Sequence, residues 1–190
     1  HIADQIMCSG ALIADDIVIT AAHCVYDPDS HRRFDPDQIE FLADLRAGRP
    51  SAVRKGRYLA VIPQYNPDSG NRSQVESDVA LLMLDRPIRS FSVTPFALGI
   101  SPGPGENVGV VSYAHDRRES PALEETCAVE AREGRALILF GRGGVIRGAG
   151  FADRKWHRHG CVRGFGNWAV RQSAGRDLDG SGWADGFASG

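Results

Sequence analysis

The chain has 190 residues, enough to bury a substantial core as one domain or as two small ones. Its formal net charge at pH 7 is −2, and acidic and basic side chains are mixed through most of the sequence, which argues against a protein that binds nucleic acid or a membrane surface. No apolar run approaches the roughly 20 residues that cross a bilayer, so we expect no membrane partner.

Between Cys8 and Asp85, short apolar runs alternate with turn residues. This pattern favours an antiparallel β-barrel or β-sandwich over helices. Strands are expected at residues 11–13, 17–19, 39–42, 58–62 and 79–84, and the last of these is the clearest buried strand. Residues 46–56, which contain arginine and glycine, are expected to form a solvated hairpin.

Residues 99–105 are rich in proline and glycine and cannot hold a helix or a central strand, so they mark the natural domain boundary. The character of the chain changes after Phe140. Fourteen of the 22 glycines and all three tryptophans lie from Gly134 onward, and no period of 2 or 3.6 residues survives there. We expect this tail to be disordered or frame-shifted, and its glycine-broken arginines leave a nucleic-acid-binding tail as the alternative.

Three motifs follow one another in the first part of the chain: Cys-Ser-Gly at 8–10, Thr-Ala-Ala-His-Cys at 20–24, and Asp-Val-Ala-Leu-Leu at 78–82. Together they resemble the trypsin-like serine proteases, in which the histidine precedes the aspartate and sits on a single helical turn after a strand. The Pro-Gln-Tyr-Asn segment at 63–66 is similar to the loop that leads to the family's aspartate. The resemblance covers about residues 5–139.

The resemblance extends into the second half through residues 108–113, which are similar to the strand that opens the family's second barrel. Ala114 stands where the family usually has glycine, and Cys127 and residues 136–139 carry the likeness a little further.

The resemblance implies an all-β fold, the trypsin-like double β-barrel, here with an incomplete second barrel. Residues 1–98 would form the first barrel, residues 99–139 the linker and the start of the second, and residues 140–190 the anomalous tail. His23 would act as general base and then general acid, with Asp78 orienting it. The implied function is serine-type endopeptidase activity on protein or peptide substrates.

The resemblance also implies a disulfide between Cys8 and Cys24, which flank a strand-turn-strand unit that can bring their side chains within bridging distance. Closing a loop of that size contributes about 3 kcal/mol. A disulfide indicates an oxidising compartment, so we expect a secreted or periplasmic protein, although four cysteines by themselves also fit buried thiols. Because the chain opens with His1 rather than methionine, we expect a processed chain or a fragment.

The nucleophile of the family is missing from the sequence. No Gly-Asp-Ser-Gly-Gly-Pro motif or close relative occurs. Ser181, in Asp-Gly-Ser-Gly, has the wrong motif order and is followed by only nine residues, whereas the family places the walls of its specificity pocket after the serine. We therefore expect an inactive chain, and the alternative is a catalytically dead, protease-like module that binds a partner through its basic tail.

No metal or cofactor is expected. The His-Arg-His-Gly-Cys segment at 157–161 has ligand types at close spacing, but no second cluster completes a tetrahedral site. Four aspartates after His23 lack a calcium-loop pattern and are interleaved with prolines, which favours a solvated loop; they are Asp27, Asp29, Asp35 and Asp37. A second disulfide between Cys127 and Cys161 is not favoured, because Cys161 lies in the anomalous tail.

A single-base shift near Ile138 would explain the change of character. If the arginines of the tail use CGN codons, the alternative frame can encode Ser-Cys from Ile138, Ser-Ser-Gly-Ala-Pro-Val across 145–151, and Thr-Val-Val-Ser-Val-Val-Ser across 159–165. These strings resemble, in order, a cysteine able to pair with Cys127, the Ser-Gly-x-Pro-Val nucleophile motif of bacterial trypsin-like proteases, and the apolar strand that follows it. The three matches in the right order favour a lost reading frame.

Overall fold

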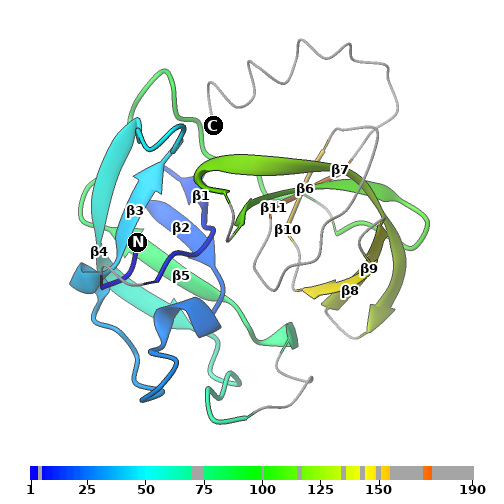
Figure 1. Ribbon diagram of the computed structural model, residues 1–190, viewed down its shortest axis with the longest axis horizontal. Helices are drawn as coiled ribbons and strands as arrows, with labels where there is room; N and C mark the ends of the chain where they lie inside the picture. Colours follow the sequence, from blue (N-terminus) through cyan, green and yellow to red (C-terminus); the bar gives the residue numbers. More distant parts are fainter. Residues whose placement is uncertain are drawn as a thin grey trace.

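A computed structural model describes the backbone of residues 1–3, 6–69, 75–99, 101–114, 117–133, 136–141, 144–148, 151–154 and 169–172. Within these ranges it describes side chains up to residue 109, at Tyr113 and at 128–131. Two β-sheets dominate the regular structure of the described residues, and the 3-10 helices among them include η1 (His23–Val25) and η2 (Pro36–Gln38) (Figure 1). The all-β fold class expected from the sequence is confirmed.

The first sheet contains five antiparallel strands in the order β1-β2-β5-β4-β3. Their bounds are β1 (Ala11–Ala14), β2 (Ile17–Thr20), β3 (Glu40–Ala43), β4 (Ala52–Val61) and β5 (Ala80–Leu84). Strand β5 therefore lies at the centre of the sheet. Its alternate residues Ala80, Leu82 and Leu84 are buried, while Leu81 and Met83 face outward, as a period of two residues requires when one face of a sheet covers the core.

The core of the first sheet is made of small and aliphatic side chains from all parts of residues 1–98. It contains Ile2, Leu12, Val18, Ala21, Cys24, Val25, Ile39, Ala43, Ala80, Leu82, Leu84, Ile88 and Val93. Each large aliphatic side chain buried in this way contributes about 1.5–3 kcal/mol. These residues form a rigid support beneath η1 and beneath the start of β5.

Strand β4 begins earlier than its sequence suggested. The hairpin expected at residues 46–56 consists of a turn closed by the Arg46–Arg49 bridge and of residues 52–55, which pair antiparallel with β3 and are exposed or half-exposed. Gly56 explains the arrangement: a Cβ atom there would lie 2.4 Å from the Pro36 carbonyl oxygen and 2.5 Å from Leu82 Cδ1. The register of β4 against β5 shifts between Gly56 and Tyr58, so the strand bulges where the backbone of η2 comes close.

The second sheet has six strands in the order β10-β11-β6-β7-β8-β9. Their bounds are β6 (Asn107–Ala114), β7 (Arg117–Glu133), β8 (Ala136–Gly141), β9 (Gly144–Gly148), β10 (Phe151–Arg154) and β11 (Ala169–Gln172). Figure 1 shows β6 and β7 as long strands that run from beside the first sheet toward β8 and β9. All pairs are antiparallel except β10 with β11. This single curled sheet agrees with the incomplete second barrel expected from the sequence.

Hydrogen bonds join β6 of the second sheet to residues that flank strands of the first sheet. The Tyr113 amide donates to Ser9 Oγ at 2.9 Å, and the Tyr113 hydroxyl donates to the Leu45 carbonyl at 3.0 Å. Residue 99 and residues 101–106, in the proline- and glycine-rich stretch, form no strand and connect the sheets. Of the tail at 140–190, the end of β8 and strands β9, β10 and β11 have described backbones, and the other residues of the tail lie outside the described ones. No described helix is long and apolar enough to cross a membrane.

Candidate active site

His23 is held at the start of a short turn that begins where β2 ends. Ala21 and Ala22 are fully buried, and their small side chains let the backbone pass close to the core. Cys24 and Val25, the next two residues of η1, are buried as well, which anchors the turn. The His23 side chain remains 45% exposed, so its imidazole is presented to solvent from a fixed backbone.

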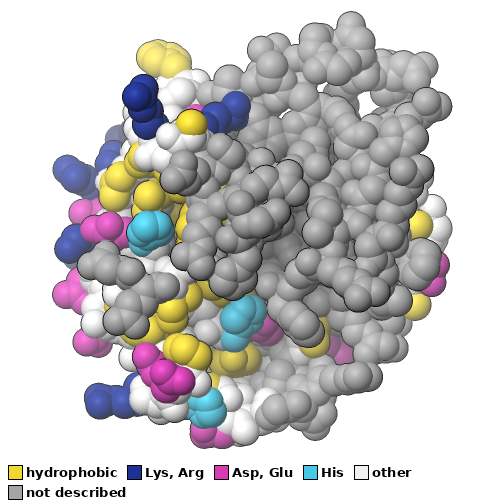
Figure 2. Space-filling model, viewed as in Figure 1, with side chains coloured by type: hydrophobic (Ala, Val, Ile, Leu, Met, Phe, Trp, Pro, Cys, Tyr) yellow, Lys and Arg dark blue, Asp and Glu magenta, His cyan; other side chains and the backbone are white. Residues whose placement is uncertain are grey.

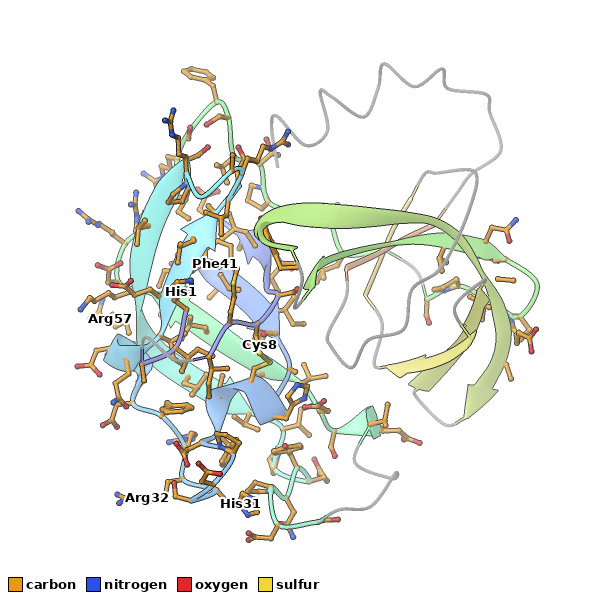
Figure 3. All side chains as sticks on the ribbon, viewed as in Figure 1. His1, Cys8, His31, Arg32, Phe41 and Arg57 are labelled. Carbon is orange, nitrogen blue, oxygen red and sulfur yellow. A yellow bond between two sulfur atoms is a disulfide. The ribbon has the colours of Figure 1, made fainter. Side chains whose placement is uncertain are left out.

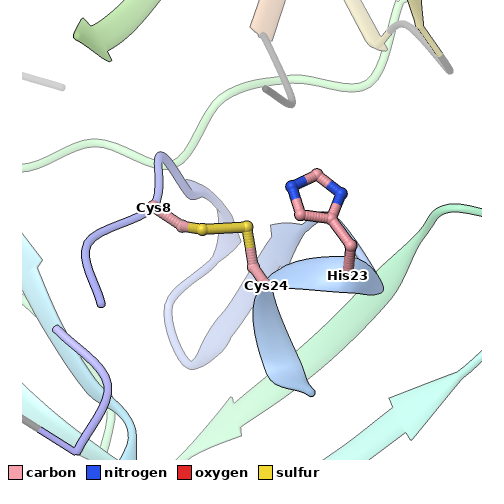
Figure 4. A group of neighbouring side chains, drawn as sticks. All are labelled: Cys8, His23 and Cys24. Atoms are coloured by element: carbon pink, nitrogen blue, oxygen red, sulfur yellow. A yellow bond between two sulfur atoms is a disulfide. The ribbon is translucent and has the colours of Figure 1, made fainter. Parts of the chain in front are cut away.

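Cys8 and Cys24 form a disulfide with a Cα–Cα distance of 6.2 Å, as expected from the sequence. The His23 ring lies beside this bond (Figure 4). The ligand atoms of these three residues lie within 4.8 Å of one another, the one such convergence of three His, Cys, Asp or Glu side chains in the part of the chain that is described. Because both sulfurs belong to the disulfide, they are not thiolates, and the cluster offers a single imidazole to a metal.

Asp78, two residues before β5, lies in contact with His23 at two atoms. Asp78 Oδ2 lies 2.7 Å from His23 Nδ1, and Asp78 Oδ1 accepts a hydrogen bond from the His23 backbone amide at 2.8 Å. An ionised carboxylate only accepts hydrogen bonds, so the proton between ring and carboxylate belongs to Nδ1. The lone pair of the neutral ring is then on Nε2, the nitrogen turned away from Asp78. The structure thus brings together the two residues predicted from the sequence.

Tyr65 lies beside this pair and was not predicted as a site residue. Its ring contacts that of Tyr26, with 5.5 Å between the ring centroids. Burial, and then the charge of Asp78, raises the pKa of Tyr65 to about 12. The phenol therefore stays neutral next to the carboxylate at physiological pH. Its position in the Pro-Gln-Tyr-Asn segment before the aspartate was the only signal in the sequence that could have indicated it.

Within the described part of the chain, the side chain that hydrogen-bonds the His23 ring is that of Asp78. Ser9 lies on the segment that carries Cys8, and its Oγ accepts a hydrogen bond from the Tyr113 amide. The other candidates that the sequence raised lie outside the described residues or side chains: Ser181, the 157–161 cluster, Cys127 and Cys161.

Comparison with known proteins shows the family to which the chain is similar. A family model described as trypsin matches residues 1–130. A relative in Drosophila melanogaster, a modular serine protease, is 37% identical over 86 residues, which are 42% of this chain and 13% of the relative. The chain therefore spans a small part of that relative's length.

Solved structures are similar at low sequence identity. A Glu endopeptidase in complex with MPD is 16% identical, with a TM-score of 0.54 over 69% of this chain and 60% of that one. Kallikrein-related peptidase 10 in complex with Zn2+ is also 16% identical, with a TM-score of 0.48 over 70% of this chain and 61% of that one.

The all-β fold and its likeness to the solved Glu endopeptidase place the chain in the chymotrypsin-like fold class. Because the family model covers more than half of the sequence, the chain belongs to the trypsin family of serine proteases.

Proposed function

We propose that this chain carries the general-base half of a serine endopeptidase site and that, with its present sequence, it does not turn over substrate. The observation that supports this function most strongly is the double contact of Asp78 with His23, at Nδ1 and at the backbone amide. An aspartate that holds Nδ1 fixes the tautomer in which Nε2 accepts a proton, as acyl transfer by a serine requires. The substrates would be proteins or peptides.

His23 would take the proton from the attacking hydroxyl at Nε2 and return it to the leaving amine. Asp78 would stabilise the imidazolium formed in between without itself being protonated. The His23 side chain is 45% exposed, so a nucleophile and a substrate could approach it. Since no nucleophile motif is present in the sequence, any remaining rate would lie orders of magnitude below that of a complete site.

A restored reading frame would supply the missing part. The nucleotides around codons 136–147 test this directly: an intact second frame that encodes the serine of the Ser-Gly-x-Pro-Val motif supports the shift, and a stop codon or unrelated residues there would refute it. The present chain and the frame-restored chain are then treated with a fluorophosphonate probe that labels activated serines. We expect labelling of the restored chain only.

Two variants control that experiment. In the restored chain, His23→Ala should abolish labelling, and Asp78→Asn should slow it by about 10⁴-fold because the ring then adopts the wrong tautomer. Labelling of the present chain would show that it contains a nucleophile and that the proposed inactivity is wrong.

A binding module is the alternative, favoured by the arginine- and glycine-rich sequence at 141–148. A module of this kind would give no probe labelling and would bind nucleic acid with an affinity that falls steeply with salt. Secretion or a periplasmic location is part of the proposal as well. The Cys8–Cys24 disulfide supports it, because such bonds persist in oxidising compartments.

A further inference from the structure

We propose that the loop after His23 positions Asp78 by clamping the segment that leads to it. The clamp consists of two side-chain contacts, Tyr26 with Tyr65 and His31 with Asp68. This inference rests on the proposed role of the His23–Asp78 pair. It makes Tyr65 and His31 positioning residues, which act on the pair through the backbone rather than by touching a substrate.

The loop that carries the first half of the clamp is held together by its own hydrogen bonds. Tyr26 bridges to Arg33, and the His31 amide donates to the Asp27 carbonyl at 2.9 Å. Asp27 Oδ1 accepts hydrogen bonds from the amide and the hydroxyl of Ser30 at 2.7 and 2.8 Å. The hydrogen bond from the Ser30 amide is the main reason that the pKa of Asp27 is lowered. These hydrogen bonds keep the loop in one conformation, so Tyr26 and His31 are held at fixed positions relative to η1.

His31 lies at the far end of this loop (Figure 3). Its Nδ1 is 2.6 Å from Asp68 Oδ1, and its backbone is left-handed, with φ 54°. The Asp68 amide in turn donates a hydrogen bond to the Asn66 side-chain oxygen at 3.0 Å. The contact thus joins two local turns, one after the histidine of the pair and one before its aspartate.

The clamped segment connects directly to Asp78 through strand pairing. Val61 pairs with Ala80, and the Ile62 amide donates to the Val79 carbonyl at 3.3 Å. The Tyr65 amide then donates to the Ile62 carbonyl at 3.0 Å. Tyr65 therefore lies one turn after Ile62, the residue that is hydrogen-bonded to Val79 next to Asp78. Fixing Tyr65 against Tyr26 therefore limits how far the start of β5 can move from η1.

The clamp is a surface feature, and this makes its role testable. The side chains of His31 and Asp68 are 44% and 74% exposed, and exposed ion pairs add little to global stability. The space-filling view shows acidic and basic side chains scattered over the described face among hydrophobic ones (Figure 2). Removing the clamp should consequently loosen the His23–Asp78 contact while the fold persists.

Amide hydrogen exchange measured by NMR on the present chain tests this. The His23 amide, bonded to Asp78 Oδ1, reports on the pair, and the Val25 amide, bonded to the Ala22 carbonyl, is the internal reference. In the Tyr65→Leu/Asp68→Ala variant we expect the His23 amide to exchange about tenfold faster, with the Val25 rate unchanged, as local opening predicts.

Two further variants complete the design. Tyr58→Leu/Asp37→Ala makes the same chemical changes at exposed positions outside the clamp and should leave both rates unchanged. Tyr65→Phe keeps the ring contact and should retain the slow exchange of the parent. An unchanged His23 rate in the clamp variant, or an equal acceleration at Val25, would overturn the clamp.

Asp78→Ala separates this inference from the proposed function. If it accelerates the His23 amide and the clamp variant does not, the clamp alone is refuted. If Asp78→Ala leaves the His23 amide unchanged, the His23–Asp78 contact is absent in solution, and the proposed function fails together with the clamp.

Discussion

Replacing both Cys8 and Cys24 by alanine should lower the free energy of unfolding by about 3 kcal/mol. The bond joins residues 16 positions apart in the sequence. In the chain-entropy model a loop of roughly this length restricts the unfolded chain by about 10 cal/mol/K, which is about 3 kcal/mol at 25 °C. Since whole domains are stable by about 5–15 kcal/mol, the loss is a large fraction of the total.

Urea denaturation of parent and variant measures this loss. Both chains should carry Cys127→Ala and Cys161→Ala, so that a thiol reductant acts on the Cys8–Cys24 bond alone. Reducing the parent, which keeps both sulfurs in place, should give the same loss as the double substitution, and the variant should not respond to reductant. The denaturant slope m should also rise, because an uncross-linked unfolded chain exposes more surface.

Two results would refute this reasoning. A loss below about 1 kcal/mol would mean that the bond does not restrict the unfolded chain as the loop length requires. A large loss on substitution without a comparable loss on reduction would place the effect in the packing of Cys24, which is 3% exposed, rather than in the cross-link.

The structure also predicts how a glycine substitution and a rise in pH change the stability of the fold. Gly56→Ala should lower the free energy of unfolding, measured by urea denaturation, by about 3 kcal/mol, because the added Cβ would overlap the Pro36 carbonyl oxygen and Leu82. Gly103→Ala is the control and should cost much less, since a Cβ there has no neighbour nearer than 3.9 Å. Equal losses in the two variants would contradict the steric explanation. Because burial raises the pKa of Tyr65 to about 12, the folded chain holds this proton longer than the unfolded chain, so its contribution to stability is complete below about pH 10 and is lost as the pH rises toward 12. Ultraviolet titration against Tyr65→Phe measures the shift, and ionisation near pH 10 in the folded chain would show that it is absent.

The parts of the fold that the sequence predicted are those fixed by local patterns. Strands β1, β2 and β5 follow from apolar runs between turn residues, and the alternation of β5 identifies its buried face. The single helical turn at His23 was predicted by family resemblance, and the structure adds that the two alanines before it are fully buried. The order of His23 and Asp78 then predicted their contact by family resemblance.

The parts that could not be predicted depend on partners distant in the chain. The sequence of β7 is rich in charged residues and contains Pro121, which does not indicate a strand. In the structure, β6 pairs with its first part and β8 with its last residues. Its regularity comes from those neighbours rather than from its own composition. The contacts of Tyr26 with Tyr65 and of His31 with Asp68 likewise join loops 37 to 39 residues apart, and no local pattern specifies which loops meet.

The place of β5 in the first sheet has a consequence for how the chain folds. It is the last of the five strands along the chain, but it lies between β2 and β4. During synthesis the β1–β2 and β3–β4 hairpins can form early, yet isolated hairpins are barely stable, and β2 and β4 keep open edges until residue 84 has been made. Inserting β5 closes both edges at once and, because Asp78 precedes it by two residues, brings the carboxylate to His23 in the same step. A nascent chain therefore acquires its oriented histidine only when the sheet is complete.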